Sequence, residues 1–395
     1  MKTISQKMII GLFFCVFLSL FSEVLLSPFY PLFFSKVFGV QDLSYAGYYI
    51  FICRLTVVLF TPIWGFLAKR FEARKLLSVG QLGTAVMTAM MALTQNVYQF
   101  TFITVLLLIF KSSYFLLYPL IIELGGEHRR STLTGVYQAV FHGAIVSSTV
   151  VGAWVLNLQH PLHLFYGVAL GDVLQFALCF MLLKNIPKLN QQKNIAKNVD
   201  SGKNPWGFII AIGLVVLTFQ LANNLVRPYF TAYVTEPKPF GVDLITSSFL
   251  FLIPSVMAIA SMPFIRRFAT SSRLSMLYTT GIMLLIGSLY LQGFSQSLPI
   301  FVMARVIYGF FLAITQGVLE LKLFENSKSN HLHFNYGLIT SFANIGHLGA
   351  PLLASSLVNS YGLAFPLIAA ATLCILNLAL AKFTIFRLKL SEGFS

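Results

Sequence analysis

The amino-acid sequence predicts an all-α membrane protein with twelve transmembrane helices in two six-helix pseudo-repeats. Of its 395 residues, 57% are hydrophobic and only 10% carry a charge, which leaves too little polar surface to cover soluble domains of this size. The apolar residues also gather in long stretches, and a helix needs about 20 such residues to cross a bilayer. Finally, the basic residues between these stretches lie mostly on one predicted side of the membrane.

The twelve predicted spans follow one another along the whole chain, separated by short loops. In order, they are residues 8–34, 44–68, 76–94, 97–121, 133–156, 163–184, 206–233, 244–265, 274–292, 298–321, 336–358 and 363–383. Four prolines within them, Pro28, Pro228, Pro254 and Pro351, are expected to kink their helices.

The charge distribution sets the topology. Most of the 27 lysines and arginines fall in loops on one side, whereas Lys36 and Lys238 lie in loops on the other. Because basic loops stay in the cytoplasm, both termini are predicted to be cytoplasmic in a multi-pass protein of the cell (inner) membrane. Topology thus explains the net charge of +15, and no nucleic-acid partner is expected.

The longest polar segment separates two halves of similar length. It is rich in Lys, Asn and Gln and has no apolar periodicity, so it is predicted to be a flexible linker. The predicted domains are a six-helix bundle over residues 1–184, a cytoplasmic linker over 185–205 and a second six-helix bundle over 206–395.

The two halves repeat each other in register. Ser27-Pro28-Phe29 matches Arg227-Pro228-Tyr229, and the segment from Gly135 to Asn157 matches the segment from Gly337 to Asn359. Parallel repeats of this kind are typical of transporters in which a central site opens alternately to each side of the membrane. The duplication is therefore the first indication of function.

Two motifs resemble those of a known family. The loop Gly65-Phe-Leu-Ala-Lys69-Arg70-Phe-Glu72-Ala-Arg74-Lys75 resembles the major facilitator signature Gly-x-Leu-Ala-Asp-Arg-x-Gly with basic residues after it. Lys69 replaces the usual Asp, and Glu72 replaces the second Gly. Arg305-Val-Ile-Tyr-Gly309 is similar to the family's Arg-x-x-x-Gly element of span 4, where this chain has Lys111 at a related depth.

The resemblance implies a monomeric secondary transporter that moves a small-molecule substrate by alternating access, coupled to protons. It implies that Gly65, Arg70 and Arg74 belong to a cytoplasmic gate and that spans 1, 4, 7 and 10 line the solute cavity. The implied cavity residues are Glu23, Lys111, Tyr114, Asn223, Asn224, Arg227, Arg305 and Tyr308.

The intramembrane charges suggest a solute class. A charge at mid-bilayer costs about 3 kcal/mol, so each one needs a partner, water or a function. Three cations against one carboxylate in the implied cavity favour a small organic anion, for example a carboxylate metabolite or a siderophore. Glu23 is the candidate proton carrier, because a nearby Arg favours its charged form whereas desolvation favours its neutral form.

Other interpretations stay open. In one alternative, the intramembrane charges only make membrane insertion tolerable, and Glu23 then pairs with Arg54 or Arg227. Arg54 and Asp172 lie on spans 2 and 6 and are interpreted as structural. A proton-driven exporter of amphiphilic drugs is the second candidate function, and a passive facilitator the third. The sequence has no motif for nucleotide hydrolysis or a metalloprotease, and its four cysteines have no metal-ligand spacing, so no enzyme, metal or cofactor is expected.

Overall fold

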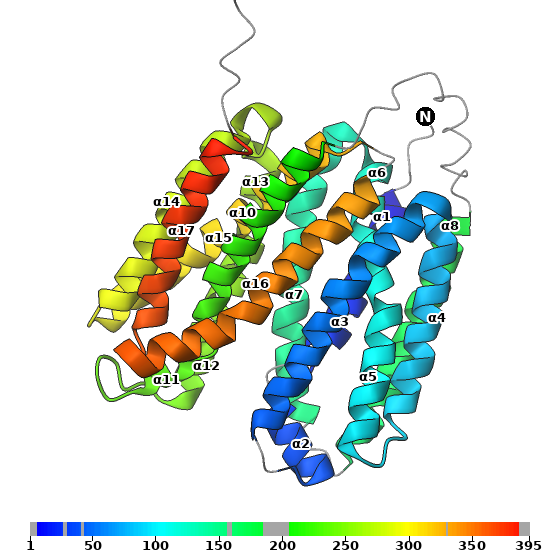
Figure 1. The fold of residues 1–395 in the computed structure, drawn as a ribbon, viewed down its shortest axis with the longest axis horizontal. Coiled ribbons are helices and arrows are strands. Elements are labelled where there is room, and N and C mark those ends of the chain that lie inside the picture. Colours follow the sequence, from blue (N-terminus) through cyan, green and yellow to red (C-terminus); the bar gives the residue numbers. More distant parts are fainter. Residues whose placement is uncertain are drawn as a thin grey trace, which may run out of the picture. The chain divides into compact units, whose positions relative to one another are not determined.

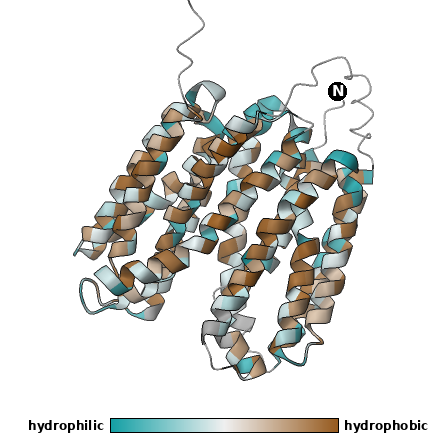
Figure 2. Ribbon diagram, in the orientation of Figure 1, coloured by the Kyte–Doolittle hydropathy of each residue, from teal (hydrophilic) through white to brown (hydrophobic). Residues whose placement is uncertain are grey.

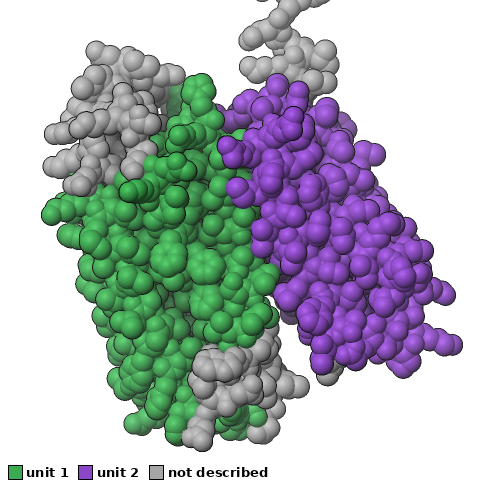
Figure 3. All heavy atoms as spheres, turned by 180° about the vertical axis from the view of Figure 1, so that it is seen from behind, with its two compact units in different colours: residues 1–204, 327–341 green, residues 205–326, 342–395 purple. Residues whose placement is uncertain are grey.

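The computed structural model describes residues 6–26, 30–40, 43–155, 160–184, 205–328 and 331–386, and within them the chain forms helices and turns but no strand (Figure 1). The predicted all-α fold class is confirmed. The predicted linker lies outside these residues except for Pro205. The chain divides into two compact units, unit 1 with residues 1–204 and 327–341, and unit 2 with residues 205–326 and 342–395 (Figure 3).

Unit 1 contains the helices of the N-terminal half. They are α1 (Gln6–Val24), α2 (Tyr30–Phe38), α3 (Leu43–Arg70), α4 (Ala73–Met91), α5 (Val97–Lys111), the 3-10 helix η2 (Ser112–Leu116), α6 (Leu117–Gly125), α7 (Arg130–Val155) and α8 (Leu164–Lys184). Two short 3-10 helices, η3 (Glu127–Arg129) and η4 (Pro161–His163), precede α7 and α8.

Unit 2 contains most of the C-terminal half. Its helices are α10 (Trp206–Leu225), α11 (Phe230–Thr235), α12 (Leu244–Ala260), α13 (Met262–Phe268), the 3-10 helix η6 (Ser271–Arg273), α14 (Leu274–Phe294), α15 (Leu298–Asn326) and α17 (Phe365–Phe383). The long helix α16 (Leu332–Tyr361) begins in unit 1 and continues in unit 2.

Hydrophobic residues run along the helices of both units (Figure 2). Nine segments of the described chain are long and apolar enough to cross a membrane. Three more helices, α4, α7 and α16, have 19, 26 and 30 residues and thus spanning length, but they carry more polar side chains. Twelve spans are consistent with these helices, and the count itself stays a prediction.

The same pairs of helices pack in both units. In unit 1, α4 packs against α5 and α8, and α8 against α1; in unit 2, α14 packs against α15 and α17, and α17 against α10 (Figure 1). The buried stripe of α8 also matches that of α17: Phe165, Ala169, Asp172, Gln175 and Cys179 correspond to Leu367, Ala371, Cys374, Asn377 and Ala381. This repetition supports the duplication predicted from the sequence.

Spans predicted as continuous are broken. α1 ends at Val24 and α2 begins at Tyr30, while α10 and α11 are separated by a turn that contains Pro228. Span 4 passes from α5 into α6 through a 3-10 segment, and there Trp64 Nε1 of α3 donates to the carbonyl of Ile109 at 2.7 Å. Each break exposes backbone groups that have to be bonded elsewhere, because lipid offers no partner.

Pro254 kinks α12, and two residues of the Arg-x-x-x-Gly element contact the kink. Because proline has no amide hydrogen, the carbonyl of Leu250, four residues earlier, loses its helical partner. Arg305 Nε of α15 donates to this carbonyl at 3.4 Å, and its second terminal nitrogen donates to Phe251 O at 3.4 Å. A Cβ at Gly309 would lie 2.3 Å from Pro254 Cα, so only glycine lets the two helices approach this closely.

Pro62 of α3, in unit 1, also leaves a backbone carbonyl without its helical partner. The carbonyl that it frees belongs to Val58, and Ser341 Oγ of α16 donates to it at 2.7 Å. At both prolines, a polar side chain from a neighbouring helix thus donates a hydrogen bond to the freed carbonyl.

Gly309→Ala is expected to destabilise unit 2, because the new methyl group meets backbone rather than a side chain that can move. Overpacking of this kind costs about 1 to 3 kcal/mol. Thermal unfolding of the purified protein should show a lower Tm for Gly309→Ala than for Gly287→Ala, since a Cβ at Gly287 meets nothing within 4 Å. Equal Tm values for the two variants would contradict this packing.

Asp243 gives unit 2 a pH-dependent helix cap outside the membrane. Hydrogen bonds from the Thr246 hydroxyl and from the amides of Thr246 and Ile245 hold the pKa of its carboxyl below the usual 3.8. The ionised carboxylate therefore stabilises the fold above its unfolded pKa, and this contribution is lost as the pH falls through the lowered folded pKa. Asp243→Ala should lower Tm at neutral pH, and the difference should shrink on acidification; a difference independent of pH would refute the cap.

Candidate functional site

A pocket lies within unit 1 among side chains of α1, α2, α3, α4, α5 and α8. Its empty space is about 880 Å³, the open mouth included. Three of its lining side chains are charged, namely Glu23, Arg54 and Lys111, and most of the others are aromatic or aliphatic. A largely apolar wall with a few polar groups is typical of sites for small organic molecules.

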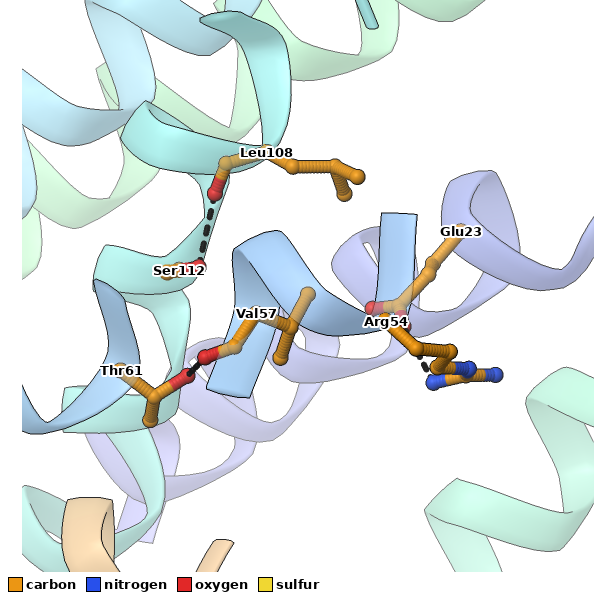
Figure 4. A network of polar contacts seen from close by, with 6 residues as sticks. All are labelled: Glu23, Arg54, Val57, Thr61, Leu108 and Ser112. Carbon is orange, nitrogen blue, oxygen red and sulfur yellow. Dashed lines mark hydrogen bonds and ion pairs between the residues drawn. The ribbon is translucent and has the colours of Figure 1, made fainter. Parts of the chain in front are cut away.

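Glu23 and Arg54 point toward each other from the end of α1 and the middle of α3 (Figure 4). Arg54 NH1 lies 3.7 Å from Glu23 Oε1, and the side chains are 34% and 19% exposed. Of the two partners that the sequence left open for Glu23, the structure shows Arg54.

Lys111 lies deeper, where α5 gives way to the 3-10 helix η2. Its side chain is buried, and Nζ donates to Ser22 Oγ at 2.7 Å. Lys111 also borders a second, smaller cavity that Tyr114 and Asp172 line. The structure thus brings Glu23 and Lys111 together in one pocket and places Tyr114 directly behind it.

Four aromatic rings form much of the apolar wall. Tyr30 and Tyr49 meet edge to face with centroids 4.7 Å apart, and Phe100 and Phe165 do so at 5.5 Å. Tyr49 donates its hydroxyl proton to Thr104 Oγ1 at 3.2 Å, which holds the ring in place. Packed rings of this kind offer faces and edges to an aromatic solute without further ordering.

The expected site residues of unit 2 lie along α10 and α15. The Tyr308 hydroxyl donates to Asn223 Oδ1 at 3.0 Å, and Asn223 Nδ2 is buried without a hydrogen-bond partner. Asn224 donates to the carbonyl of Gln220 in its own helix at 2.8 Å. Arg227 is exposed in the turn between α10 and α11.

Arg305 is 4% exposed and already has partners for its guanidinium. Besides the carbonyls of Leu250 and Phe251, it contacts Gln292 Oε1 at 3.4 Å and lies 4.3 Å from the centroid of the Phe230 ring. In this structure Arg305 therefore stabilises α12, and its predicted contact with a solute stays a prediction.

Sequence analysis did not select Arg54, Tyr49, Phe100 or Phe165 for the pocket. Arg54 was interpreted as structural because span 2 was expected to lie away from the cavity. The signal that pointed to it was the need of Glu23 for a cation at the same depth of the membrane. The three rings gave no signal, because a helix that is apolar on all sides does not show which face turns inward.

The predicted gate residues lie at the junction of α3 and α4. A Cβ at Gly65 would lie 2.8 Å from His333 O and 2.9 Å from Phe334 Cα, so glycine allows the first turn of α16 to pack on α3. Lys69, in place of the family's Asp, holds its Nζ 3.9 Å from the centroid of the Phe334 ring. A cation–π contact thus stands where the family signature has a carboxylate.

Arg70 and Arg74 stack on rings within unit 1. The guanidinium of Arg70 lies 5.2 Å from the ring centroid of Phe66, and that of Arg74 lies 4.9 Å from that of Phe180. Glu72 precedes α4 and makes no capping hydrogen bond with its side chain.

Comparisons with known proteins agree on the family. The Major Facilitator Superfamily model matches residues 12–291 and 212–392. Multidrug resistance protein MdtG of Salmonella choleraesuis (strain SC-B67) is 22% identical over 346 residues, which are 86% of this chain and 85% of that protein, and MdtG of Salmonella typhi matches with the same figures. The human organic anion transporter MFSD10 (TETRAN) is similar in structure, with a TM-score of 0.77 at 17% identity over 95% of this chain and 99% of that one.

The family match extends over nearly the whole chain, and the all-α fold with its apolar spans agrees with it. This chain therefore belongs to the major facilitator superfamily of secondary transporters and is a multi-pass protein of the cell membrane.

Proposed function

We propose that the protein moves amphiphilic organic solutes across the membrane by alternating access, driven by protons. The observation that supports this function is the pocket of unit 1, in which one ion pair lies in a wall of aromatic and aliphatic side chains. Rings and alkyl groups bind such a wall, and the charges orient the polar part of the solute. The similarity to multidrug resistance protein MdtG favours the same solute class.

Glu23 is the residue that we assign to proton coupling. Among the lining residues of the pocket it supplies the carboxylate, and Arg54 favours its ionised form. Binding of a proton neutralises Glu23 and releases Arg54 from the pair. A cationic solute and a proton therefore compete for one carboxylate, and this competition exchanges one for the other across the membrane.

An organic anion is the second candidate solute, as the sequence favoured. When Glu23 carries a proton, Arg54 and Lys111 remain as two cations beside the pocket, and both bind carboxylate or phosphate groups well. The structural neighbour named as a human organic anion transporter is consistent with this alternative.

We further place the cytoplasmic gate where the first turns of α16 pack in unit 1. Gly65 and Lys69 contact this segment, and His333 Nε2 lies 3.3 Å from Glu123 Oε2 beside them. Opening on this side requires these contacts to separate. All described residues that line the pocket belong to unit 1, so we propose that a single chain suffices, with solute, protons and lipid as its partners.

Glu23→Gln is expected to abolish proton-driven transport while leaving the pocket shape unchanged. In energised everted vesicles, the native chain should accumulate ethidium, a cationic amphiphile, and an uncoupler should abolish accumulation. Glu23→Gln should fall to the uncoupled level, whereas Glu127→Gln should keep native transport, because Glu127 is an exposed carboxylate whose side chain is 83% accessible. Native accumulation with native pH dependence in Glu23→Gln would remove Glu23 from the mechanism.

The same vesicles distinguish the two solute classes. Transport of carboxyfluorescein but not ethidium would select the organic anion, and Arg54→Gln should then weaken its binding by about tenfold or more, since hydrogen bonds to charged groups contribute about 1.5 to 3 kcal/mol. Transport of neither probe, with or without a proton gradient, would contradict both candidates.

A further inference from the structure

A second cavity lies behind Lys111 in unit 1, with an empty space of about 230 Å³. Of the residues that the structure describes, Lys111 is the one that lines both this cavity and the solute pocket. The small cavity is polar and lined by buried side chains from four spans, namely Ser19 of α1, Gln81 and Thr84 of α4, Lys111 of α5 with Ser113 and Tyr114 of η2, and Asp172 and Gln175 of α8.

Lys111 and Asp172 both line this cavity, yet within the described chain no direct ion pair joins them. Two further atoms that line it, Gln81 Oε1 and Ser113 Oγ, are buried without a hydrogen-bond partner. We expect water in the cavity, which can accept from Lys111 or Ser113 and donate to Asp172 or Gln81.

The geometry around Thr88 fits a protonated Asp172. Thr88 Oγ1 lies 2.7 Å from Asp172 Oδ2 and 2.9 Å from the carbonyl of Thr84, but a hydroxyl has only one proton to donate. If Asp172 is ionised, both contacts have to share the single hydroxyl hydrogen of Thr88. If Asp172 carries a proton, it donates to Thr88 Oγ1, and Thr88 donates to Thr84, so that both contacts are hydrogen bonds.

Unit 2 shows that the helix packing does not require this polar cluster. The buried stripes of α4, α5 and α8 match those of α14, α15 and α17 in unit 2, where five of the equivalent residues are apolar and buried, whereas Gln175 corresponds to the polar Asn377. Gln81, Thr84, Thr88, Lys111 and Asp172 correspond to Ile282, Leu285, Leu289, Leu312 and Cys374. Because a buried charged pair seldom adds stability over an apolar one, the cluster of unit 1 points to a function.

We propose that Asp172 is a second proton-binding carboxyl of the transporter, joined through water in the small cavity to Lys111 and thereby to the solute pocket. This proposal rests on the proton-driven transport proposed above and adds a site to it. Protonation of Asp172 leaves Lys111 without its balancing charge beside the pocket. Proton binding and solute binding are thus coupled through the Lys111 ammonium group, which borders both the small cavity and the solute pocket.

The proton reaches Asp172 through Thr88, which lines the solute pocket. A hydronium ion in the pocket gives a proton to Thr88 Oγ1, Thr88 gives its own proton to Asp172 Oδ2, and water remains in the pocket; Lys111 stays protonated. The titratable groups nearby are Lys111 and Tyr114 at the cavity, Cys15 and Cys179 beyond Gln175 and Gln81, and Glu23 on the pocket side of Lys111.

Infrared difference spectroscopy tests the site without any transported solute. The full chain is purified in lipid nanodiscs with ¹³C-carboxyl-labelled aspartate, and spectra at mildly acidic and mildly alkaline pH are subtracted. Asp42, Asp200 and Asp243 are the other aspartates of the chain, so in the variant Asp42→Asn/Asp200→Asn/Asp243→Asn the labelled signal belongs to Asp172 alone. We expect a labelled carboxylic-acid C=O band that appears at acidic pH.

Three further variants make the assignment. The band should vanish in Asp172→Asn, return in Asp172→Glu with labelled glutamate, and persist in Glu23→Gln. A labelled carboxylate that stays ionised at every pH at which the protein is folded would overturn the proposal. Because the spectra require no transport, this result is separate from a failure of the vesicle experiments, which would count against the proposed function.

Discussion

Every backbone carbonyl inside a bilayer has to find a hydrogen-bond donor within the protein, and the arrangement of this chain depends on that constraint. Breaks in the helices leave such carbonyls without helical partners. Side chains of neighbouring helices donate to carbonyls at or beside these breaks: Ser341 to Val58, Trp64 to Ile109, and Arg305 to Leu250 and Phe251. The bends that a transporter needs are thus held by specific side chains.

The constraint separates two kinds of buried polar residue. Arg305 uses its donors on the kink of α12, and Gly309 makes room for the same kink. Lys111 and Asp172 instead bond to the side chains of Ser22 and Thr88, and unit 2 packs the same helices with apolar residues in their place. Charges that the fold does not need are the better candidates for solute and proton binding.

The sequence predicted the spans well because lipid demands long apolar stretches whatever the packing. It also located Glu23 and Lys111, since a charge within an apolar stretch is conspicuous. The role of Arg305 could not be predicted from the sequence, because its partners are two carbonyls beside a proline on another helix. Nor could the sequence show that Arg54 faces the pocket or that α16 begins in unit 1, because both depend on tertiary contacts between helices that are apolar on most sides.

The central claim is that the buried charges of unit 1 serve function whereas Arg305 serves the fold. The most direct test compares the Tm of the purified native chain with those of Arg305→Met and of Lys111→Leu/Asp172→Cys, which puts the residues of unit 2 into unit 1. We expect Arg305→Met to lower Tm, because two carbonyls lose their donor, and the double variant to melt at or above the native temperature. A double variant that melts well below both the native chain and Arg305→Met would contradict the claim.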